Sequence, residues 1–330
     1  MKKALITGIS GQDGQYLAEL LLSKNYKVYG LIRGQNNPKK DYINKFFPKI
    51  EIIEGDLTDS SSLIRALEIS QPDEVYNLAA ISFVGYSWNH AILTSQVSAF
   101  GVLNLLEAIK IWAGNSIHKI KFYQASSSEM FGRVQEVPQK EGTLLWPRSP
   151  YGVAKAFGHH ITINYRESYG LFACSGILFN HESPRRGEEF VTRKISINVA
   201  KIALGMQEKF ELGNLNSRRD WGFAGDYVEA MWKMLQLHDA DDFVIATGQS
   251  HSVEDFLVEA FNEVGIQKWQ KHVAVSEKLF RPAEVENLIG DSTKAKKILD
   301  WQPKTSFKEL VSMMVQSDLK NLTKIKACEH

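Results

Sequence analysis

The stretch TGISGQDG, residues 7–14, decides the fold, because it joins a short apolar run to a helical pattern through three regularly spaced glycines. Gly8, Gly11 and Gly14 form a G-x-x-G-x-x-G turn. Glycines at these positions permit a tight turn and let the backbone approach a pyrophosphate, which then sits at the N-terminus of the following helix. The spacing predicts a dinucleotide-binding strand–turn–helix unit at the start of the chain.

The first half of the sequence continues in the same rhythm. Apolar, β-rich runs at residues 3–8, 26–32, 50–56, 74–80, 120–126 and 172–179 alternate with helical patterns such as 16–25 and 61–70. Nearly continuous apolar strands are expected where helices cover both faces of a sheet. The pattern predicts an α/β protein with a Rossmann-type, doubly wound parallel sheet.

After about residue 180 the pattern changes to charged loops, helical stretches at 226–237 and 252–265, and one further strand at 242–248. We interpret this part as a smaller α/β C-terminal substrate-binding lobe, from which the chain returns at least once to the sheet. The expected division is a nucleotide-binding domain at 1–180 and about 216–250, and a lobe at about 181–215 and 251–330.

Composition is that of an ordinary globular protein. The 330 residues are 44% hydrophobic and 23% charged, with a net charge of +1, which disfavours binding to nucleic acid by bulk electrostatics. Two cysteines, Cys174 and Cys328, without a CxxC pair favour a reduced, cytoplasmic setting. We expect no metal site, and no segment that could span a bilayer.

Cofactor choice depends on the end of the second strand. A carboxylate there would bind the ribose hydroxyls of NAD, but the sequence GLIRGQNN offers Arg33 instead. Since an arginine pairs with a 2′-phosphate, NADP is favoured. Asp56 follows the third strand, where this fold usually contacts the adenine, although a simple turn aspartate explains it equally well.

A second motif is YGVAK, residues 151–155, which follows Ser149 and Pro150. Proline suits the first position of a helix, and a spacing of four puts Tyr151 and Lys155 on one helical face. The lysine cation would stabilise a phenolate, which can take a proton from a sugar hydroxyl while the carbon gives up hydride.

The stretch QASSSEMFG, residues 124–132, places hydroxyls and a carboxylate at the end of the fifth predicted strand. Ligands bind at that edge of open α/β sheets. Ser127 is placed to hydrogen-bond the oxygen that Tyr151 deprotonates. Plain dehydrogenation needs nothing more, so Glu129 suggests a second proton transfer.

These motifs, with PRSPYGVAK, NYRESYGLFACSGILFNHESPRRGEEFVTRK and RRDWGFAGDYVEAMW, resemble the GDP-mannose 4,6-dehydratase family of extended short-chain dehydrogenases/reductases. The resemblance runs from Ala4 to about Leu319. It implies a redox-neutral reaction in which hydride leaves C4 of the mannosyl ring for NADP. A glutamate then removes the C5 proton, water leaves from C6, and the hydride returns to C6.

The resemblance also implies residue roles. The family's Thr-Ser-Glu site falls on Ser127, Ser128 and Glu129, and its tyrosine and lysine fall on Tyr151 and Lys155. The implied cofactor contacts are Gly8, Ile9, Ser10, Gly11, Gln12, Asp13, Gly14, Arg33, Asp56, Leu57, Leu78, Ala79, Ala80, Ser82, Tyr151, Lys155, His181 and Arg186. The implied substrate contacts are Ser82, Ser127, Glu129, Asn180, Lys194, Arg219, Arg281 and Glu284. A homodimer or homotetramer is implied as well.

The sequence departs from the family pattern at several positions. Ser127 replaces a threonine, Arg33-Gly34 replaces an arginine pair, Ile81 replaces a glutamine, and Leu144, Leu145 and Trp146 replace smaller or phenolic groups. Ile81 and the last three are expected to flank the sugar pocket, which leaves a GDP-manno-heptose open as substrate. A GDP-sugar 4-reductase, 4-dehydrogenase or epimerase also stays open on the same fold, as does a nucleotide sensor with a dead site.

Overall fold

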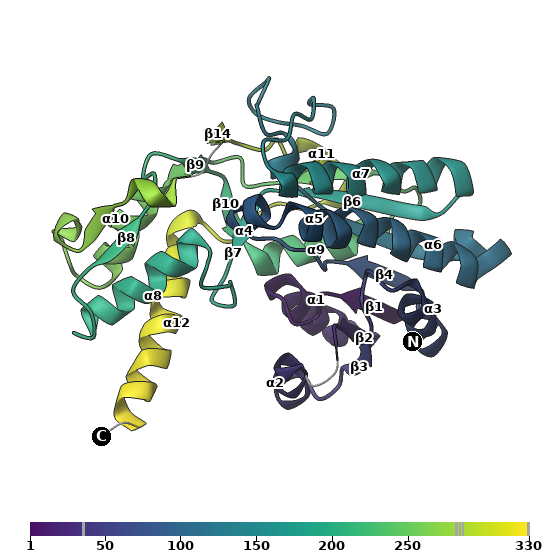
Figure 1. The fold of residues 1–330 in the computed structure, drawn as a ribbon, viewed down its shortest axis with the longest axis horizontal. Helices are drawn as coiled ribbons and strands as arrows, with labels where there is room; N and C mark the ends of the chain where they lie inside the picture. Colours follow the sequence, from purple (N-terminus) through teal and green to yellow (C-terminus); the bar gives the residue numbers. More distant parts are fainter. Residues whose placement is uncertain (35–36, 281–282, 284, 286, 329–330) are drawn as a thin grey trace.

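The computed structural model describes residues 1–34, 37–280, 283, 285 and 287–328, and its centre is a parallel sheet of seven strands (Figure 1). The strand order is β3-β2-β1-β4-β5-β6-β11. These strands are Lys3–Thr7 (β1), Lys27–Ile32 (β2), Glu51–Glu54 (β3), Glu74–Asn77 (β4), Lys121–Ser127 (β5), Phe172–Leu178 (β6) and Asp242–Ile245 (β11). The order reverses between β1 and β4, as in doubly wound nucleotide-binding sheets, and the predicted fold class is confirmed.

Helices cover both faces of this sheet, and the pleat of the strands explains why. Within β1, Ala4 and Ile6 pack into one apolar cluster and Leu5 into another on the opposite face. The first face is covered by α1 (Gln12–Ser23), α2 (Pro38–Phe46) and α9 (Ala224–Met234). The second is covered by α3 (Ser60–Ser70), α6 (Gly101–Ala113) and α7 (Pro150–Tyr169).

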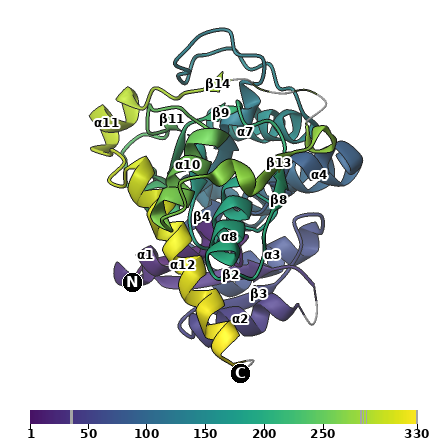
Figure 2. The same cartoon turned by 90° about the vertical axis from the view of Figure 1, so that its left-hand side faces the viewer.

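A separate apolar cluster lies beside the sheet. It joins α8 (Val191–Ala203), α10 (Val253–Glu263) and α12 (Phe307–Cys328) with the short pair β8 (Phe210–Leu212) and β13 (Val273–Val275). Figure 1 shows these helices to the left of the sheet, and Figure 2 turns that side toward the viewer. As expected, the chain returns from this region to the sheet. It adds β11 at the sheet edge next to β6, and α11 (Thr293–Leu299) later packs against β11 and α9.

Shorter elements connect these parts. They are α4 (Val84–Asn89), α5 (Ala91–Ser95), the π-helix η1 (Gln96–Phe100), η2 (Gly114–Lys119), η3 (Ser128–Met130), β7 (Asn180–Glu182), β9 (Arg218–Arg219), β10 (Trp221–Phe223), β12 (His251–Ser252), η4 (Trp269–Lys271), η5 (Glu277–Leu279), β14 (Asn287–Leu288) and α11 (Thr293–Leu299). β7 pairs in parallel with β10, which joins the segment after β6 to the strand that leads into α9, and β9 pairs in parallel with β14.

The expectation that no segment could span a bilayer does not hold when only length and composition are considered. The helical stretch Ala91–Lys119 is long and apolar enough to cross a bilayer, by length and composition alone. In the fold, however, Val102, Leu105 and Ile109 of this stretch are fully buried against the sheet and α3. Half of the most apolar window of this stretch is buried inside the protein.

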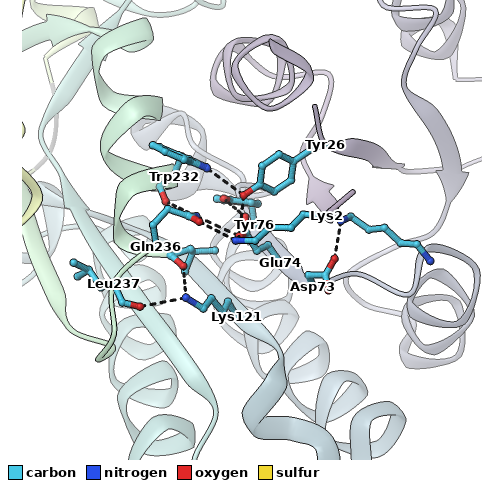
Figure 3. A network of polar contacts seen from close by, with 11 residues as sticks. Lys2, Tyr26, Asp73, Glu74, Tyr76, Lys121, Trp232, Gln236 and Leu237 are labelled. Atoms are coloured by element: carbon cyan, nitrogen blue, oxygen red, sulfur yellow. Dashed lines mark hydrogen bonds and ion pairs between the residues drawn. The ribbon is translucent and has the colours of Figure 1, made fainter. Parts of the chain in front are cut away.

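A buried carboxylate organises the sheet edge opposite the carboxyl ends of the strands (Figure 3). Glu74 of β4 has no solvent exposure. Its oxygens accept hydrogen bonds from Lys2 Nζ at 2.9 Å, Tyr26 Oη at 3.0 Å and Tyr76 Oη at 2.7 Å. The Gln236 amide donates a fourth at 3.2 Å and links this group to the end of α9.

Replacing Glu74 by alanine is expected to lower the free energy of unfolding by about 3 kcal/mol, because two buried tyrosine hydroxyls would lose their acceptor. Urea unfolding measures the change. Glu51→Ala is the matched control, since Glu51 pairs with Lys27 at the surface and its loss should cost less than about 1 kcal/mol. Equal losses in the two variants would contradict the stabilising role of the Glu74 network.

Candidate active site

The glycine turn forms the floor of the site. Gly8 adopts φ +73°, and a side chain there would collide with the Ala79 backbone nitrogen, 2.8 Å from the ideal Cβ position. The turn therefore needs glycine both for its conformation and for its closeness to the end of β4. Gly11 is the N-cap of α1 and supplies no side-chain cap. The first-turn N–H groups of α1 are thus left for an anionic ligand, as a pyrophosphate requires.

A single large cavity of about 1220 Å³ runs from this turn, along the carboxyl ends of the strands, to the lobe. That volume exceeds the range of about 300–1,000 Å³ usual for drug-sized ligands. It suits a dinucleotide beside a second nucleotide. The predicted residues that line the cavity are Gly8, Ser10, Gly11, Gln12, Asp13, Gly14, Arg33, Asp56, Leu57, Leu78, Ala79, Ala80, Ser82, Ser127, Glu129, Tyr151, Lys155, Asn180, His181, Arg186, Lys194 and Arg219.

Three predicted residues are not placed on this surface. Ile9 is fully buried and belongs to the apolar core, where its side chain fills the space beside Gly30. Arg281 and Glu284 lie outside the described residues. The spacing of the glycine motif could not separate Ile9 from its neighbours. The sequence does not show which side chains of a tight turn face the ligand and which face the core.

An ion pair neutralises the glycine turn. Asp13 Oδ2 lies 2.8 Å from His181 Nε2, and the other ring nitrogen of His181 lies 2.8 Å from the Phe179 carbonyl oxygen. Burial opposes the charge on Asp13, but the histidine outweighs burial and holds the pKa of Asp13 at about 2. Burial also opposes a charge on His181, and Asp13 outweighs it and raises the pKa of the imidazole. When His181 is protonated, it offsets the negative charge of Asp13, which would otherwise repel a pyrophosphate.

The catalytic candidates at the end of β5 are buried. Ser127 is 9% exposed and Glu129 is 7% exposed. Ser127 Oγ accepts a hydrogen bond from the Glu129 backbone N–H at 3.2 Å, which caps the short helix η3. Ser127 is also placed beside the Tyr151 phenol, where its hydroxyl favours the phenolate. One serine therefore lies beside both the phenol and the segment that carries the carboxylate.

Helix α7 delivers Tyr151 and Lys155 to the same place. Pro150 occupies the first turn, as the sequence predicted, and Ser149 Oγ caps the helix by accepting from the Gly152 N–H at 3.0 Å. A Cβ on Gly152 would lie 2.7 Å from the Glu129 carbonyl oxygen. Glycine at this position lets the helix start rest directly on η3, which brings Tyr151 beside Glu129.

Burial sets the protonation of this pair in the absence of ligand. It raises the pKa of Tyr151 to about 12, although the hydrogen bond from Ser127 favours the phenolate. It lowers the pKa of Lys155 to about 8. Lys155 Nζ donates to the Ala125 carbonyl oxygen at 2.8 Å and lies 5.8 Å from the centre of the Tyr151 ring. The lysine is therefore held near the phenol, on the face that the spacing predicted.

The cavity end near β2 contains two polar residues that sequence reasoning missed. Asn37 and Lys39 line it together with Arg33. Asn37 caps α2 by accepting from the Lys39 N–H, and its amide donates to the Arg33 carbonyl oxygen at 2.7 Å. The sequence Asn-Pro-Lys-Lys, a few residues after Arg33, could have indicated these two residues, because it marks a helix start that carries cations.

The lobe side of the cavity combines cations with apolar groups. Lys194 and Arg219 line it, and so does Asn180, whose buried Oδ1 has no hydrogen-bond partner among the described residues. An orphaned buried acceptor facing a cavity is expected to be satisfied by a ligand donor. Further lining residues that the motifs did not indicate are Phe83, Phe190, Leu212, Gly213, Asn214, Ser217 and Leu279.

One prediction about this cavity is not supported. Leu144, Leu145 and Trp146 were expected to flank the sugar pocket, yet they are not among the residues that line the cavity. Leu144 and Trp146 lie exposed on a loop, where the Arg133 guanidinium covers the Trp146 ring at 5.4 Å. Ile81, the fourth residue behind the argument for a larger sugar, does line the cavity, so that argument keeps one of its four residues. In the described part of the chain, no group of three His, Cys, Asp or Glu side chains is arranged to hold a metal ion.

Comparison with known proteins places this geometry in a family. The profile of a family described as GDP-mannose 4,6 dehydratase matches residues 5–314, nearly the whole chain. The chain belongs to that family. Within it, GDP-mannose 4,6 dehydratase 2 of Arabidopsis thaliana is 52% identical over 326 residues, which cover 96% of this chain and 87% of the relative.

Solved structures share the fold of this GDP-mannose 4,6 dehydratase family member at lower identity. A dTDP-glucose 4,6-dehydratase of Bacillus anthracis in complex with NAD superposes with a TM-score of 0.83 at 21% identity, covering 98% of each chain. RMD from Pseudomonas aeruginosa, complexed with NADPH, gives a TM-score of 0.79 at 21% identity, covering 97% of this chain and 100% of its own. These likenesses concern the fold.

Proposed function

We propose that the protein is a GDP-mannose 4,6-dehydratase, which converts GDP-mannose to its 4-keto-6-deoxy form. The observation that carries the proposal is the meeting of Ser127, Glu129, Tyr151 and Lys155 in one cavity, in a chain 52% identical to a GDP-mannose 4,6 dehydratase. A nicotinamide dinucleotide bound on the glycine turn would supply the hydride acceptor that takes the C4 hydrogen and returns it at C6.

The chain's own groups account for the protons. Ser127 orients the C4 hydroxyl, and Tyr151 takes its proton, aided by the cation of Lys155. The resulting C4 ketone acidifies C5, and Glu129 removes that proton. The carboxylic acid then protonates the C6 hydroxyl, which leaves as water. The sugar loses two protons, one from the C4 hydroxyl and one from C5. It receives two, one on the leaving C6 hydroxyl and one on C5, so the protons balance.

The remaining roles are assigned by position. We propose that residues 1–180 and about 216–250 bind the cofactor, and that about 181–215 and 251–330 bind the sugar nucleotide. On the lobe side, Lys194 and Arg219 supply the positive charge that a diphosphate needs. A soluble, cytoplasmic protein fits the burial of Val102, Leu105 and Ile109 within the apolar stretch 91–119, and of Cys174.

A different net reaction on the same fold is the second candidate. A 4-reductase, 4-dehydrogenase or epimerase would use Ser127, Tyr151 and Lys155 but needs no base at C5. The position of Glu129, buried beside Tyr151, favours the dehydratase.

The proposal is tested by incubating the protein with GDP-mannose and substoichiometric NADP in heavy water. The protons on the carboxyl of Glu129 and the phenol of Tyr151 exchange with water, so we expect a 6-deoxy product carrying deuterium at C5, seen by NMR. Oxidised sugar with a matching amount of free NADPH, and no 6-deoxy signal, would favour a dehydrogenase instead.

The finer choice of NADP over NAD rests on Arg33 and Lys39. Replacing Arg33 by alanine is expected to weaken NADP binding about tenfold and to leave NAD binding nearly unchanged, because only NADP carries the 2′-phosphate. Isothermal titration with each cofactor measures the difference, and Lys45→Ala, on α2 and outside the cavity lining, is the control. An equal loss for both cofactors would place Arg33 away from the 2′-phosphate.

We further propose a homodimer formed through α5, η1 and α7. The rings of Phe100 and Phe157 contact each other at 5.7 Å between centroids and are 53% and 37% exposed. Ile92 and Val153 extend this exposed apolar surface, and such surfaces commonly form subunit contacts. Phe100→Glu is expected to yield monomers in light scattering, whereas Phe46→Glu on α2 should leave the assembly unchanged. Monomeric wild type would contradict the proposal.

A further inference from the structure

An aromatic contact joins the two walls of the cavity. Phe83 follows β4, on the cofactor side, and Phe190 precedes α8, on the lobe side. Their rings meet edge to face, with centroids 5.6 Å apart and planes at 73°. Both line the cavity, and each is next to another lining residue, Ser82 and Val191. The contact therefore lies at the seam between the expected cofactor and sugar-nucleotide halves.

The Phe190 ring is held firmly from behind. The Arg186 guanidinium lies 3.5 Å from the centre of this ring, within the range of a strong cation–π contact. Arg186 in turn pairs with Glu182 at 3.1 Å, and Glu182, which is 2% exposed, also accepts from Thr192 Oγ1 at 2.6 Å. A buried ion pair thus fixes the position of the ring.

The Phe83 ring is placed by its own helix start. It folds back over Gly85, where a Cβ would lie only 3.0 Å from the ring. Glycine at that position leaves room for the ring to lean toward Phe190. Neither ring carries a group for acid–base chemistry, so their contribution must come from shape and from the exclusion of water.

We propose that Phe83 and Phe190 form an aromatic clamp that retains the oxidised sugar between the two halves of the reaction. This rests on the proposed function, which requires a 4-keto sugar to stay in place until hydrogen returns at C6. If the ketone escapes first, the sugar has lost two electrons and leaves one reduced nicotinamide behind. Retention is therefore a separate requirement from catalysis.

The clamp is tested by Phe83→Ala and Phe190→Ala in two measurements. With the cofactor-free protein, surface plasmon resonance should show GDP-mannose dissociating about 3- to 10-fold faster, while GDP dissociates as from wild type, because only the sugar reaches the clamp. In turnover with NADP, the ratio of released keto sugar and reduced nicotinamide to 6-deoxy product should rise by a similar factor.

Controls separate the clamp from general damage. Phe83→Leu keeps most of the volume if the alanine variant folds poorly, and should show an intermediate effect. Phe46→Ala removes an exposed ring that packs on Tyr42 outside the cavity, and should change neither readout. Because the clamp needs both rings, the double alanine variant should resemble each single one.

The outcomes are distinguishable from failure of the proposed function. If wild type makes no 6-deoxy product, the function is wrong. If wild type makes it but the alanine variants keep both the dissociation rate of GDP-mannose and the product ratio of wild type, the clamp is wrong. Faster dissociation of GDP alone, to the same extent, also contradicts it, since the rings would then act on the nucleotide.

Discussion

Glu129→Gln is expected to reduce the formation of 6-deoxy product by about 10³-fold, because the amide cannot remove the C5 proton. Oxidation at C4 should survive, since Ser127, Tyr151 and Lys155 are unchanged. Mixing the variant with GDP-mannose and NADP should therefore give about one reduced nicotinamide per active site, without turnover. Absorbance follows the first step and NMR of the sugar follows the second.

The split between the two readouts separates a base at C5 from a structural residue. A glutamine of the same shape keeps the packing of η3 against α7, so a loss of folding is not expected. Glu68→Gln, on the exposed face of α3, is the control and should behave as wild type. Normal amounts of 6-deoxy product from the Glu129 variant would assign the C5 proton to another group.

Lys155→Met is expected to lower turnover by about 10²- to 10⁴-fold and, at the same time, to stabilise the cofactor-free protein at pH 7. The lysine is 4% exposed, and burial lowers its pKa from 10.5 to about 8. At pH 7 the folded protein holds a buried ammonium group, which costs up to about 3 kcal/mol. Loss of the hydrogen bond to the Ala125 carbonyl offsets part of the gain.

The sign of the pH dependence follows from that lowered pKa. Between pH 8 and 10.5 the unfolded chain binds the proton that the folded chain has released, so wild type gains stability as pH rises. The advantage of Lys155→Met should therefore be largest below pH 8 and fade toward pH 10.5. Urea unfolding across this range tests it, with Lys268→Met as a surface control. A constant difference at all pH values would show that Lys155 is not buried as a cation.

Much of the fold could be predicted because its determinants are local. Each strand of the sheet is an apolar run bounded by polar residues, and the glycine turn fixes the first crossover. The start of α7 was equally clear from Pro150. The length and hydrophobicity of the apolar stretch 91–119 stand in the sequence and were overlooked, whereas its packing against the sheet is visible only in the structure.

The site was predictable where one motif holds the chemistry, and not where loops converge. Ser127, Glu129, Tyr151 and Lys155 lie on elements whose ends the sequence marks. Phe83 and Phe190 are far apart in sequence and meet only because β4 and α8 border the same cavity. Leu144 and Trp146 show the opposite error, since closeness to Tyr151 in sequence did not place them in the pocket.

The central claim is a redox-neutral dehydration, in which the hydrogen lost from C4 is the one gained at C6. GDP-mannose deuterated at C4, incubated with the protein and unlabelled NADP, tests this most directly. We predict a 4-keto-6-deoxy product with deuterium at C6 and no label in the free cofactor. Deuterium recovered in NADPH, or retained at C4 of the sugar, would contradict the account.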